Sequence, residues 1–172
     1  TPPHQPAGAI VNRVSQLIGH TPLMELLRTR FGSRILLKLE QGNPTGSAKI
    51  RMARQMLDEA EQQGLLAPGG WVIESTSGNT GMGLALLAAE RGYRFTAVVD
   101  HHAAKDKIRA MQAFGAELIF VNEDGGDSLA TADREALAEK IAAEQGAYWT
   151  EQHNNPANGN GYTYVAEELH DA

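Results

Sequence analysis

The chain has 172 residues, of which 42% are hydrophobic, and a formal net charge of −6; this size and composition suit one globular domain, or one domain with part of another, and exclude a disordered chain. The sequence contains no cysteine, which excludes disulfides, thiolate metal sites and a cysteine nucleophile. The one run rich in basic residues, 105–109, is short, so no nucleic-acid partner is expected. The apolar run 84–89 is too short to cross a bilayer and residues 1–11 lack the apolar core of a signal peptide, so we expect a cytoplasmic protein without a membrane partner.

The first part of the chain predicts a turn of helix, two strands and one long helix. Residues 14–18 form the helical turn and residues 22–26 the first strand. Residues 34–40 are an apolar run of β type, and we predict a buried strand there. A helix that ends near residues 63–64 follows, because apolar residues recur at helical spacing at Ile50, Ala53, Met56, Leu57 and Ala60.

The rest of the chain alternates between short apolar strands and helices. Strands are expected at 71–74, 95–99, 118–121 and 147–149, helices at 80–91, 105–114 and 128–145, and a loop at 122–126. Gly92 and Gly115 are the expected stops of the two earlier helices. This alternation favours an α/β fold of three αβα layers around a mostly parallel, twisted sheet.

The turn 43–46 delivers Lys49 to the start of a helix. If Ser47 caps that helix, Lys49 lies in the first turn, where the helix dipole favours a neutral amine, the form that attacks a carbonyl in Schiff-base chemistry. The alternative is an ordinary solvated lysine. Two residues separate Gly46 from Lys49, so the spacing of a phosphate loop is absent and an ATPase is excluded. Arg51 either orients Lys49 or faces solvent.

A second polar loop, 74–83, joins a strand to a helix at the carboxyl end of the strand, where open parallel sheets bind ligands. Its hydroxyl groups, glycines and helix N-terminus suit a carboxylate or a phosphate, although a simple helix cap with turning glycines is the alternative. Gly78, Gly81 and Gly83 have the reverse of the dinucleotide-binding spacing. The histidines are scattered or adjacent, so no metal site is expected.

The two loops, in this order, resemble those of the cysteine synthase and cystathionine β-synthase family, pyridoxal phosphate (PLP) enzymes of fold type II that are similar to the tryptophan synthase β subunit. The motifs that carry the resemblance run over nearly the whole chain; they are Gly19-His20-Thr21-Pro22-Leu23, Lys38-Leu39-Glu40, Asn43-Pro44, Lys49 with Arg51, Thr76-Ser77-Gly78-Asn79-Thr80-Gly81, Phe114-Gly115-Ala116-Glu117 and Asn155-Pro156-Ala157-Asn158.

The resemblance implies a role for each matching residue. Lys49 would be the catalytic lysine, which holds PLP as an internal aldimine and then takes the Cα proton of the substrate. Asn79 would bind the ring hydroxyl group of the cofactor. The carboxylate of an amino-acid substrate would be received by Thr76, Ser77, Gly78, Thr80 and Gln152.

The implied reaction is β-replacement on an activated serine, of the O-acetyl- or O-phosphoserine type, through an aminoacrylate. Sulfide as the nucleophile would give cysteine. One alternative is a related enzyme that makes another β-substituted alanine, such as a diamino acid; a second is a non-catalytic module that binds a partner protein. Ile50, His153 and residues 161–169 depart from the pattern of plain cysteine synthases.

The resemblance also implies a domain division. Residues 1–42 would begin the large domain, residues 43–150 would form the small αβα domain with the PLP lysine and the substrate loop, and residues 151–172 would return to the large domain. We expect the 172 residues alone to be inactive, because the phosphate cradle of the family follows this region, and we expect a homodimer at full length.

Overall fold

The structure is a computed structural model that describes residues 10–121 and 130–172. Four parallel strands form the main sheet in the order β5-β4-β3-β6, and two antiparallel strands form a separate hairpin. The strands are β1 (Leu23–Arg28), β2 (Arg34–Lys38), β3 (Trp71–Ser75), β4 (Arg94–Val99), β5 (Glu117–Phe120) and β6 (Tyr148–Trp149). The α-helices are α1 (Lys49–Gln62), α2 (Asn79–Arg91), α3 (Lys105–Ala113), α4 (Thr131–Gln145), α5 (Pro156–Asn160) and α6 (Thr163–His170), and two 3-10 turns are η1 (Val14–Leu17) and η2 (Glu40–Gly42).

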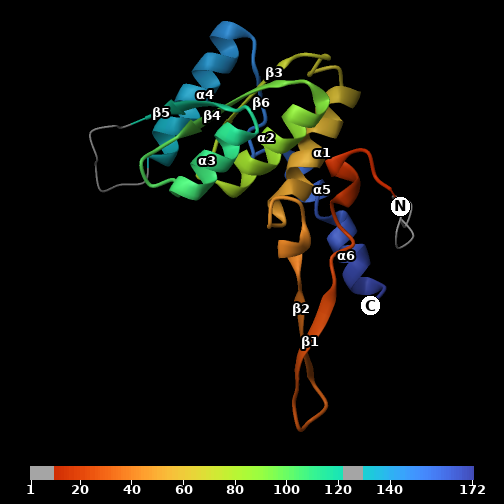
Figure 1. Cartoon of the computed structure of the whole chain (residues 1–172). Coiled ribbons are helices and arrows are strands. Elements are labelled where there is room, and N and C mark those ends of the chain that lie inside the picture. Colours follow the sequence, from red (N-terminus) through yellow and green to blue (C-terminus); the bar gives the residue numbers. More distant parts are fainter. Residues whose placement is uncertain (1–9, 122–129) are drawn as a thin grey trace.

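Helices cover both faces of the parallel sheet (Figure 1). Alternate residues of a strand point to opposite faces, and the core divides accordingly. Ile73 and Val98 pack with α4 residues such as Ala138, whereas Val72 and Val99 belong to the larger core that includes α1, α2 and α3. The predicted three-layer α/β fold is confirmed.

Two helix ends confirm glycine stops, and one predicted helix start lies outside the described residues. As predicted, Gly92 follows α2 and Gly115 follows the last residues of α3, with φ values of 76° and 88°, a left-handed conformation that glycine adopts without steric cost. The predicted loop 122–126 and the predicted start of α4 at residue 128 fall among residues that are not described. The described part of α4 begins at Thr131.

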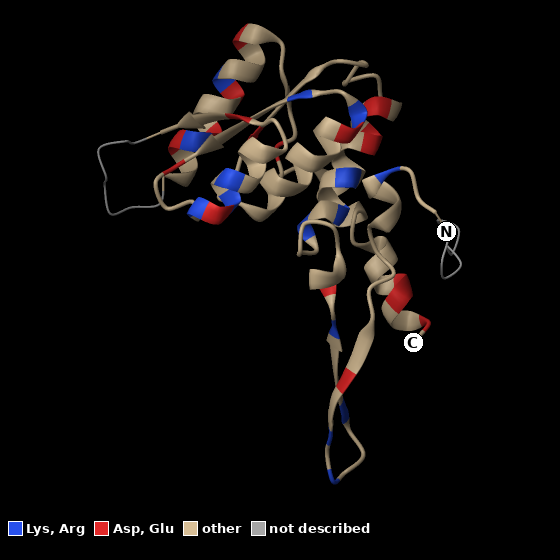
Figure 2. Cartoon of the chain, viewed as in Figure 1, with Lys and Arg blue, Asp and Glu red and all other residues tan. Residues whose placement is uncertain are grey.

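The hairpin corrects one prediction. Residues 34–40 were predicted as a buried strand, but β2 ends at Lys38 and its residues are largely exposed: Ile35 is 45% exposed and Leu36 39%. The reason is the pairing, because β2 pairs only with β1 and the hairpin extends away from the sheet and its helices (Figure 1). Its end carries the arginines that flank and form the turn (Figure 2).

Close packing between helices fixes the start of α1. A Cβ atom at Gly83 of α2 would lie 3.1 Å from the Cα atom of Ile50, so the two helices approach closely beside Lys49. On another side of α1, a Cβ atom at Gly161 would lie 2.6 Å from the Cα atom of Met52. These glycines allow the backbones of α2 and of the α5–α6 junction to lie against α1.

Replacing Gly161 with alanine is expected to destabilise the fold by about 1–3 kcal/mol, the usual cost of overpacking, because the added methyl group meets backbone atoms of Met52 that cannot move aside independently. Gly159→Ala is the matched control, since a Cβ atom there has no neighbour within 4 Å. Urea unfolding of both variants measures the difference; equal midpoints would contradict the packing argument.

Candidate active site

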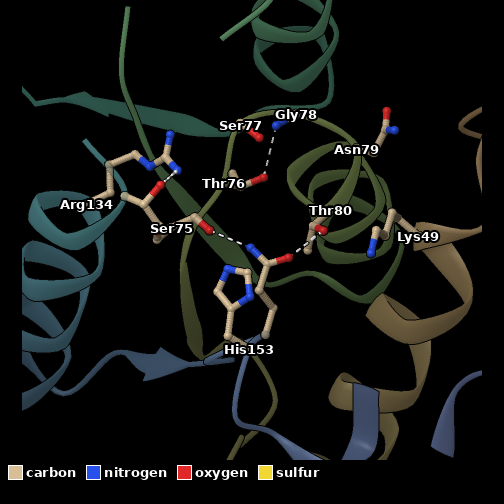
Figure 3. Close-up of a pocket in the computed structure, with 11 residues that line it drawn as sticks. Lys49, Ser75, Thr76, Ser77, Gly78, Asn79, Thr80, Arg134 and His153 are labelled. Atoms are coloured by element: carbon tan, nitrogen blue, oxygen red, sulfur yellow. Dashed lines mark hydrogen bonds between the residues drawn. The ribbon is translucent and has the colours of Figure 1, made fainter. Parts of the chain in front are cut away.

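Lys49, which follows the first predicted turn, and the second predicted loop line a cavity of about 350 Å³ at the carboxyl end of β3. Figure 3 shows that Lys49 approaches from α1, the loop of residues 75–80 lies between β3 and α2, and Arg134 approaches from α4. The lining residues are Lys49, Ser75, Thr76, Ser77, Gly78, Asn79, Thr80, Thr131, Arg134, Gln152 and His153. All seven residues that the sequence singled out for the site therefore line one cavity.

Lys49 is the first residue of α1, as the sequence predicted, but the expected cap is different. The N-cap position is occupied by Ala48 rather than Ser47, and Ala48 is already in the helical region. The Ser47 hydroxyl oxygen instead accepts a hydrogen bond from the backbone N–H of Lys49 at 3.1 Å. Ser47 therefore makes the contact expected of a cap, although α1 begins one residue later than a cap at Ser47 would place it, and the Lys49 side chain is exposed to the cavity.

Thr76 organises the loop between β3 and α2. Its buried hydroxyl oxygen accepts the backbone N–H groups of Gly78, at 3.2 Å, and Gly81, at 3.0 Å. A Cβ atom at Gly81 would lie 2.6 Å from Cγ2 of Thr76 and 2.5 Å from the sulfur atom of Met111, so only glycine permits this approach. Because the oxygen is filled as an acceptor, the hydroxyl hydrogen of Thr76 is left to donate.

Gln152 joins the end of β3 to the first turn of α2. Its side-chain oxygen accepts the Thr80 hydroxyl at 2.7 Å, and its side-chain nitrogen donates to the backbone oxygen of Ser75 at 2.7 Å (Figure 3). The preceding residue, Glu151, has φ of 48°, a strained conformation for a residue other than glycine. Gln152 thus lines the cavity while also fixing the geometry of the loop.

Asn79 lies at the cavity, but its side chain has a different partner from the one expected. Lys107 of α3 donates from its amine to the Asn79 side-chain oxygen. In Figure 3 the Asn79 carboxamide is directed away from the Lys49 amine. To reach a ring held at Lys49, this side chain has to rotate away from Lys107.

Glu74 is a buried acid directly behind the cavity. Its carboxylate accepts the Thr150 hydroxyl group and the backbone N–H of Gln152. Burial raises the pKa of Glu74 to about 7, although these hydrogen bonds act in the opposite direction. Because the Glu74 carboxylate accepts the backbone N–H of Gln152, the charge of Glu74 affects the position of Gln152 at the cavity.

The raised pKa of Glu74 predicts a pH-dependent loss of stability. In the unfolded chain the Glu74 carboxyl group ionises near its usual pKa of 4.5, whereas in the fold it stays protonated to about pH 7. The contribution of Glu74 to the stability of the fold is therefore fully present below pH 4.5. It is lost as the pH rises through 7, by on the order of 3 kcal/mol. Glu74→Gln, which cannot ionise, is expected to be less sensitive to pH than the wild type between pH 5 and 8. Thermal unfolding across this range, with the exposed Glu139→Gln as control, tests this; parallel curves for wild type and Glu74→Gln would contradict it.

Arg51 faces the interior rather than solvent. It is 3% exposed and forms ion pairs with Glu40, at 2.8 Å, and with Glu168 of α6, at 2.8 Å. Glu168 also pairs with Lys38 at 2.5 Å. This cluster ties the start of α1 to β2 and α6, so Arg51 holds the backbone next to Lys49 in place. Of the two alternatives for Arg51, exposure to solvent is wrong.

The cavity also contains residues that were not predicted, among them Thr131, Arg134 and His153. The sequence analysis placed a helix at 128–145 and did not single out Arg134. A signal was present, because Arg134, Ala138 and Ile141 recur at helical spacing and are the buried residues of α4. Over residues 10–121 and 130–172, no helix is long and apolar enough to cross a membrane and no cluster of potential metal ligands occurs.

Comparison with known proteins gives consistent matches. The family described as "Pyridoxal-phosphate dependent enzyme" matches residues 14–172. The chain is 51% identical over 158 residues to a putative cysteine synthase of Sinorhizobium fredii, covering 91% of this chain and 47% of that protein. It is 41% identical over 162 residues to cysteine synthase B of Escherichia coli, covering 92% and 52%.

Solved structures match in the same way. Cysteine synthase from Entamoeba histolytica superposes with a TM-score of 0.85 at 35% identity, covering 98% of this chain and 51% of that one. An O-ureido-L-serine synthase gives a TM-score of 0.82 at 33% identity, covering 94% and 50%. The chain thus spans about half the length of these relatives. The predicted resemblance is confirmed, and the chain belongs to the family of pyridoxal-phosphate dependent enzymes.

Proposed function

We propose that this chain carries the lysine and the substrate loop of a PLP-dependent enzyme of β-replacement on an activated serine. The single observation that supports this most strongly is the position of Lys49, whose amine opens into the same cavity as the loop of residues 75–80. Sulfide, with cysteine as product, is the leading nucleophile, since the curated relatives are cysteine synthases.

The side chains around the cavity fit the cofactor chemically. A primary amine is what bonds to the PLP aldehyde carbon, and no ion pair of Lys49 is present among the described residues. The opposite wall offers hydroxyl groups at Thr76 and Ser77 and the N-terminus of α2, whose helix dipole suits an anion. PLP, when bound, would supply an electron sink for the carbanion at Cα.

The residues of the chain would then bind, orient and move a proton. The Thr76 hydroxyl hydrogen and Ser77 would hold the α-carboxylate of the substrate, so that its Cα–H bond faces the Lys49 amine, and Gly78 would let the loop approach the substrate closely. Lys49 would take the Cα proton as general base. Thr80 and Gln152 would keep the loop in position through their mutual hydrogen bond, and Asn79 would bind the cofactor ring hydroxyl after leaving Lys107.

The test is to add PLP to the purified chain, reduce with borohydride and locate the adduct by peptide mass. An adduct confined to Lys49 supports the proposal. Absence of an adduct, or label spread equally over exposed lysines such as Lys105 and Lys140, contradicts the proposal that this chain forms the lysine site by itself.

A second candidate function is β-replacement with a nucleophile other than sulfide. One structural neighbour is an O-ureido-L-serine synthase, and His153 lines the cavity beside Gln152. Assays of an active preparation with sulfide, thiols, amines and hydroxyurea as competing nucleophiles would rank them. A preference for sulfide would contradict this second candidate and favour cysteine synthesis.

The domain division at residues 42 and 150, the homodimer and the cytoplasmic location remain predictions from the resemblance. Light scattering of an active preparation measures the oligomeric state. A monomer with full activity would contradict the homodimer.

A further inference from the structure

Arg134 occupies the wall of the cavity opposite Lys49 (Figure 3). Its side chain is only 7% exposed, and it projects from the face of α4 that also carries buried Ala138 and Ile141. An arginine at such a depth needs partners for its charge and its five N–H donors. The partners that it has, and those that it lacks, indicate its role.

One carboxylate holds the guanidinium group from behind. Nη1 of Arg134 donates to Asp100, which is fully buried at the end of β4 and also accepts the backbone N–H of His102 at 3.0 Å. Nη2 donates to the Thr131 hydroxyl at 3.2 Å. These contacts fix the plane of the guanidinium group at the cavity wall.

The donors of Arg134 are nevertheless not all used. Its Nε atom is buried and has no hydrogen-bond partner among the described residues, a situation that costs about 1–3 kcal/mol for a buried polar group. If the ion pair only held α4 against β4, a further acceptor from the protein would be expected at Nε. Because Nε itself is buried, the donors that can face the cavity are the second N–H groups of Nη1 and Nη2, which the contacts with Asp100 and Thr131 leave over.

The charge around the cavity favours an anion. Lys49 and Arg134 line it, and none of the described lining residues is acidic. Several acids next to the lining residues have partners of their own: Asp100 pairs with Arg134, Glu135 with His153 at 3.5 Å, and Glu74 accepts from Thr150 and Gln152. The α-carboxylate of a substrate would use the loop of residues 76–80, which leaves Arg134 for another group.

We propose that Arg134, together with the Thr131 hydroxyl, binds a second oxyanion in addition to the α-carboxylate. This oxyanion belongs to one of the two substrates, the serine donor or the nucleophile. This inference rests on the proposed function and narrows its substrate class. The oxyanion has two sources: a phosphate leaving group on the serine donor, or a carboxylate of an amino-acid nucleophile. A serine donor with a neutral ester and a sulfide nucleophile would together leave Arg134 without a ligand.

The experiment measures binding of defined probes to the full chain by calorimetry. The probes are inorganic phosphate and O-phospho-L-serine for the first source, L-aspartate for the second, and O-acetyl-L-serine as the probe without a second oxyanion. The variant is the double substitution Arg134→Gln with Asp100→Asn, which removes both charges and leaves no unpaired buried acid. Arg109→Gln, an exposed arginine on α3, is the matched control.

The double variant is expected to bind at least one of phosphate, O-phospho-L-serine and L-aspartate at least tenfold more weakly, with no change for O-acetyl-L-serine and no change in Arg109→Gln. Loss confined to phosphate and O-phospho-L-serine identifies the leaving group as the source; loss confined to L-aspartate identifies the nucleophile. Equal affinities of wild type and double variant for every probe overturn the proposal.

A measurement on the wild type avoids dependence on folding of the variant. The Nε–H signal of Arg134 in ¹H–¹⁵N NMR, assigned by its absence in Arg134→Lys, is expected to shift as phosphate or L-aspartate is added, and an unmoved signal at saturation overturns the proposal. The borohydride test at Lys49 distinguishes failure of the proposed function from failure of the proposed Arg134 site. An adduct at Lys49 without an Arg134 response leaves the proposed function intact, whereas an Arg134 response without an adduct leaves an anion site and removes the lysine chemistry.

Discussion

Replacing Lys49 with alanine is expected to abolish the borohydride-trapped PLP adduct and to lower β-replacement in an active preparation at least about 10³-fold. The amine is proposed both to hold the cofactor and to take the Cα proton, and general-base catalysis alone contributes about 10²–10⁴-fold. The Lys49 side chain is exposed to the cavity and is not packed in the core. Its removal should therefore leave the stability of the fold nearly unchanged.

Lys105→Ala is the matched control for this result, because Lys105 is also the exposed first residue of a helix but lies outside the cavity. Peptide mass mapping and the rate of product formation are measured on both variants, with thermal unfolding to verify the fold. Retention of a specific adduct in Lys49→Ala, or equal loss in Lys105→Ala, would show that another amine holds the cofactor.

Replacing Arg51 with methionine is expected to destabilise the fold by about 3–5 kcal/mol, the cost of leaving buried charges without their partner. Arg51 is the shared partner of Glu40 and Glu168, and it also lies within 3.4 Å of the Thr21 hydroxyl. Arg109→Met on the exposed face of α3 should change stability by no more than about 0.5 kcal/mol. Urea unfolding measures both.

The origin of this loss can be separated from simple loss of packing. Adding Glu40→Gln and Glu168→Gln to Arg51→Met removes the unpaired carboxylates and is expected to recover part of the stability. If the triple variant is as unstable as Arg51→Met alone, the loss comes from the hydrocarbon portion of Arg51 and the electrostatic account is wrong.

The same cluster of Arg51, Glu40 and Glu168 predicts a loss of stability at low pH. Burial alone would raise the pKa of Glu168, but hydrogen bonds from Arg51, Lys38 and the backbone of His20 lower it to about 2. Because the folded pKa lies below the usual value of 4.5, this contribution is fully present above pH 4.5 and is lost as the pH falls toward 2. Glu40, whose pKa is also lowered, adds to the effect, so acid unfolding should be shallower in the triple variant.

Most of the chain could be predicted from local patterns. The strands β3, β4, β5 and β6 and the helices α1, α2 and α3 lie within a few residues of the predicted ranges. Glycines mark the ends of α2 and α3, as predicted. Short apolar runs separated by helices produce a parallel sheet because each crossover returns the chain to the same end. The residues of the two loops come together for the same reason, since β3 ends where both α2 and the Gln152 segment begin.

The errors arose where solvent exposure depends on partners that the local sequence does not reveal. An apolar run such as 34–40 has the same pattern whether a sheet is covered or open, and β2 turned out to belong to an exposed hairpin. The hydrogen bond between Asn79 and Lys107, 28 residues away, was likewise not foreseen, while the role of Asn79 toward the cofactor stays a prediction.

The sequence alone therefore determined the family and the α/β class and indicated Lys49 with the loop of residues 76–80 as the candidate site, because these depend on short motifs and on periodicities within single elements. Only the tertiary structure decided that Arg51 faces inward to Glu168, 117 residues away, and that Arg134 lies across the cavity from Lys49 with Asp100, 34 residues away, behind it. The physical reason is that burial and charge pairing depend on which distant segments pack together. A charged side chain shows no preference for interior or solvent until its partners are in place.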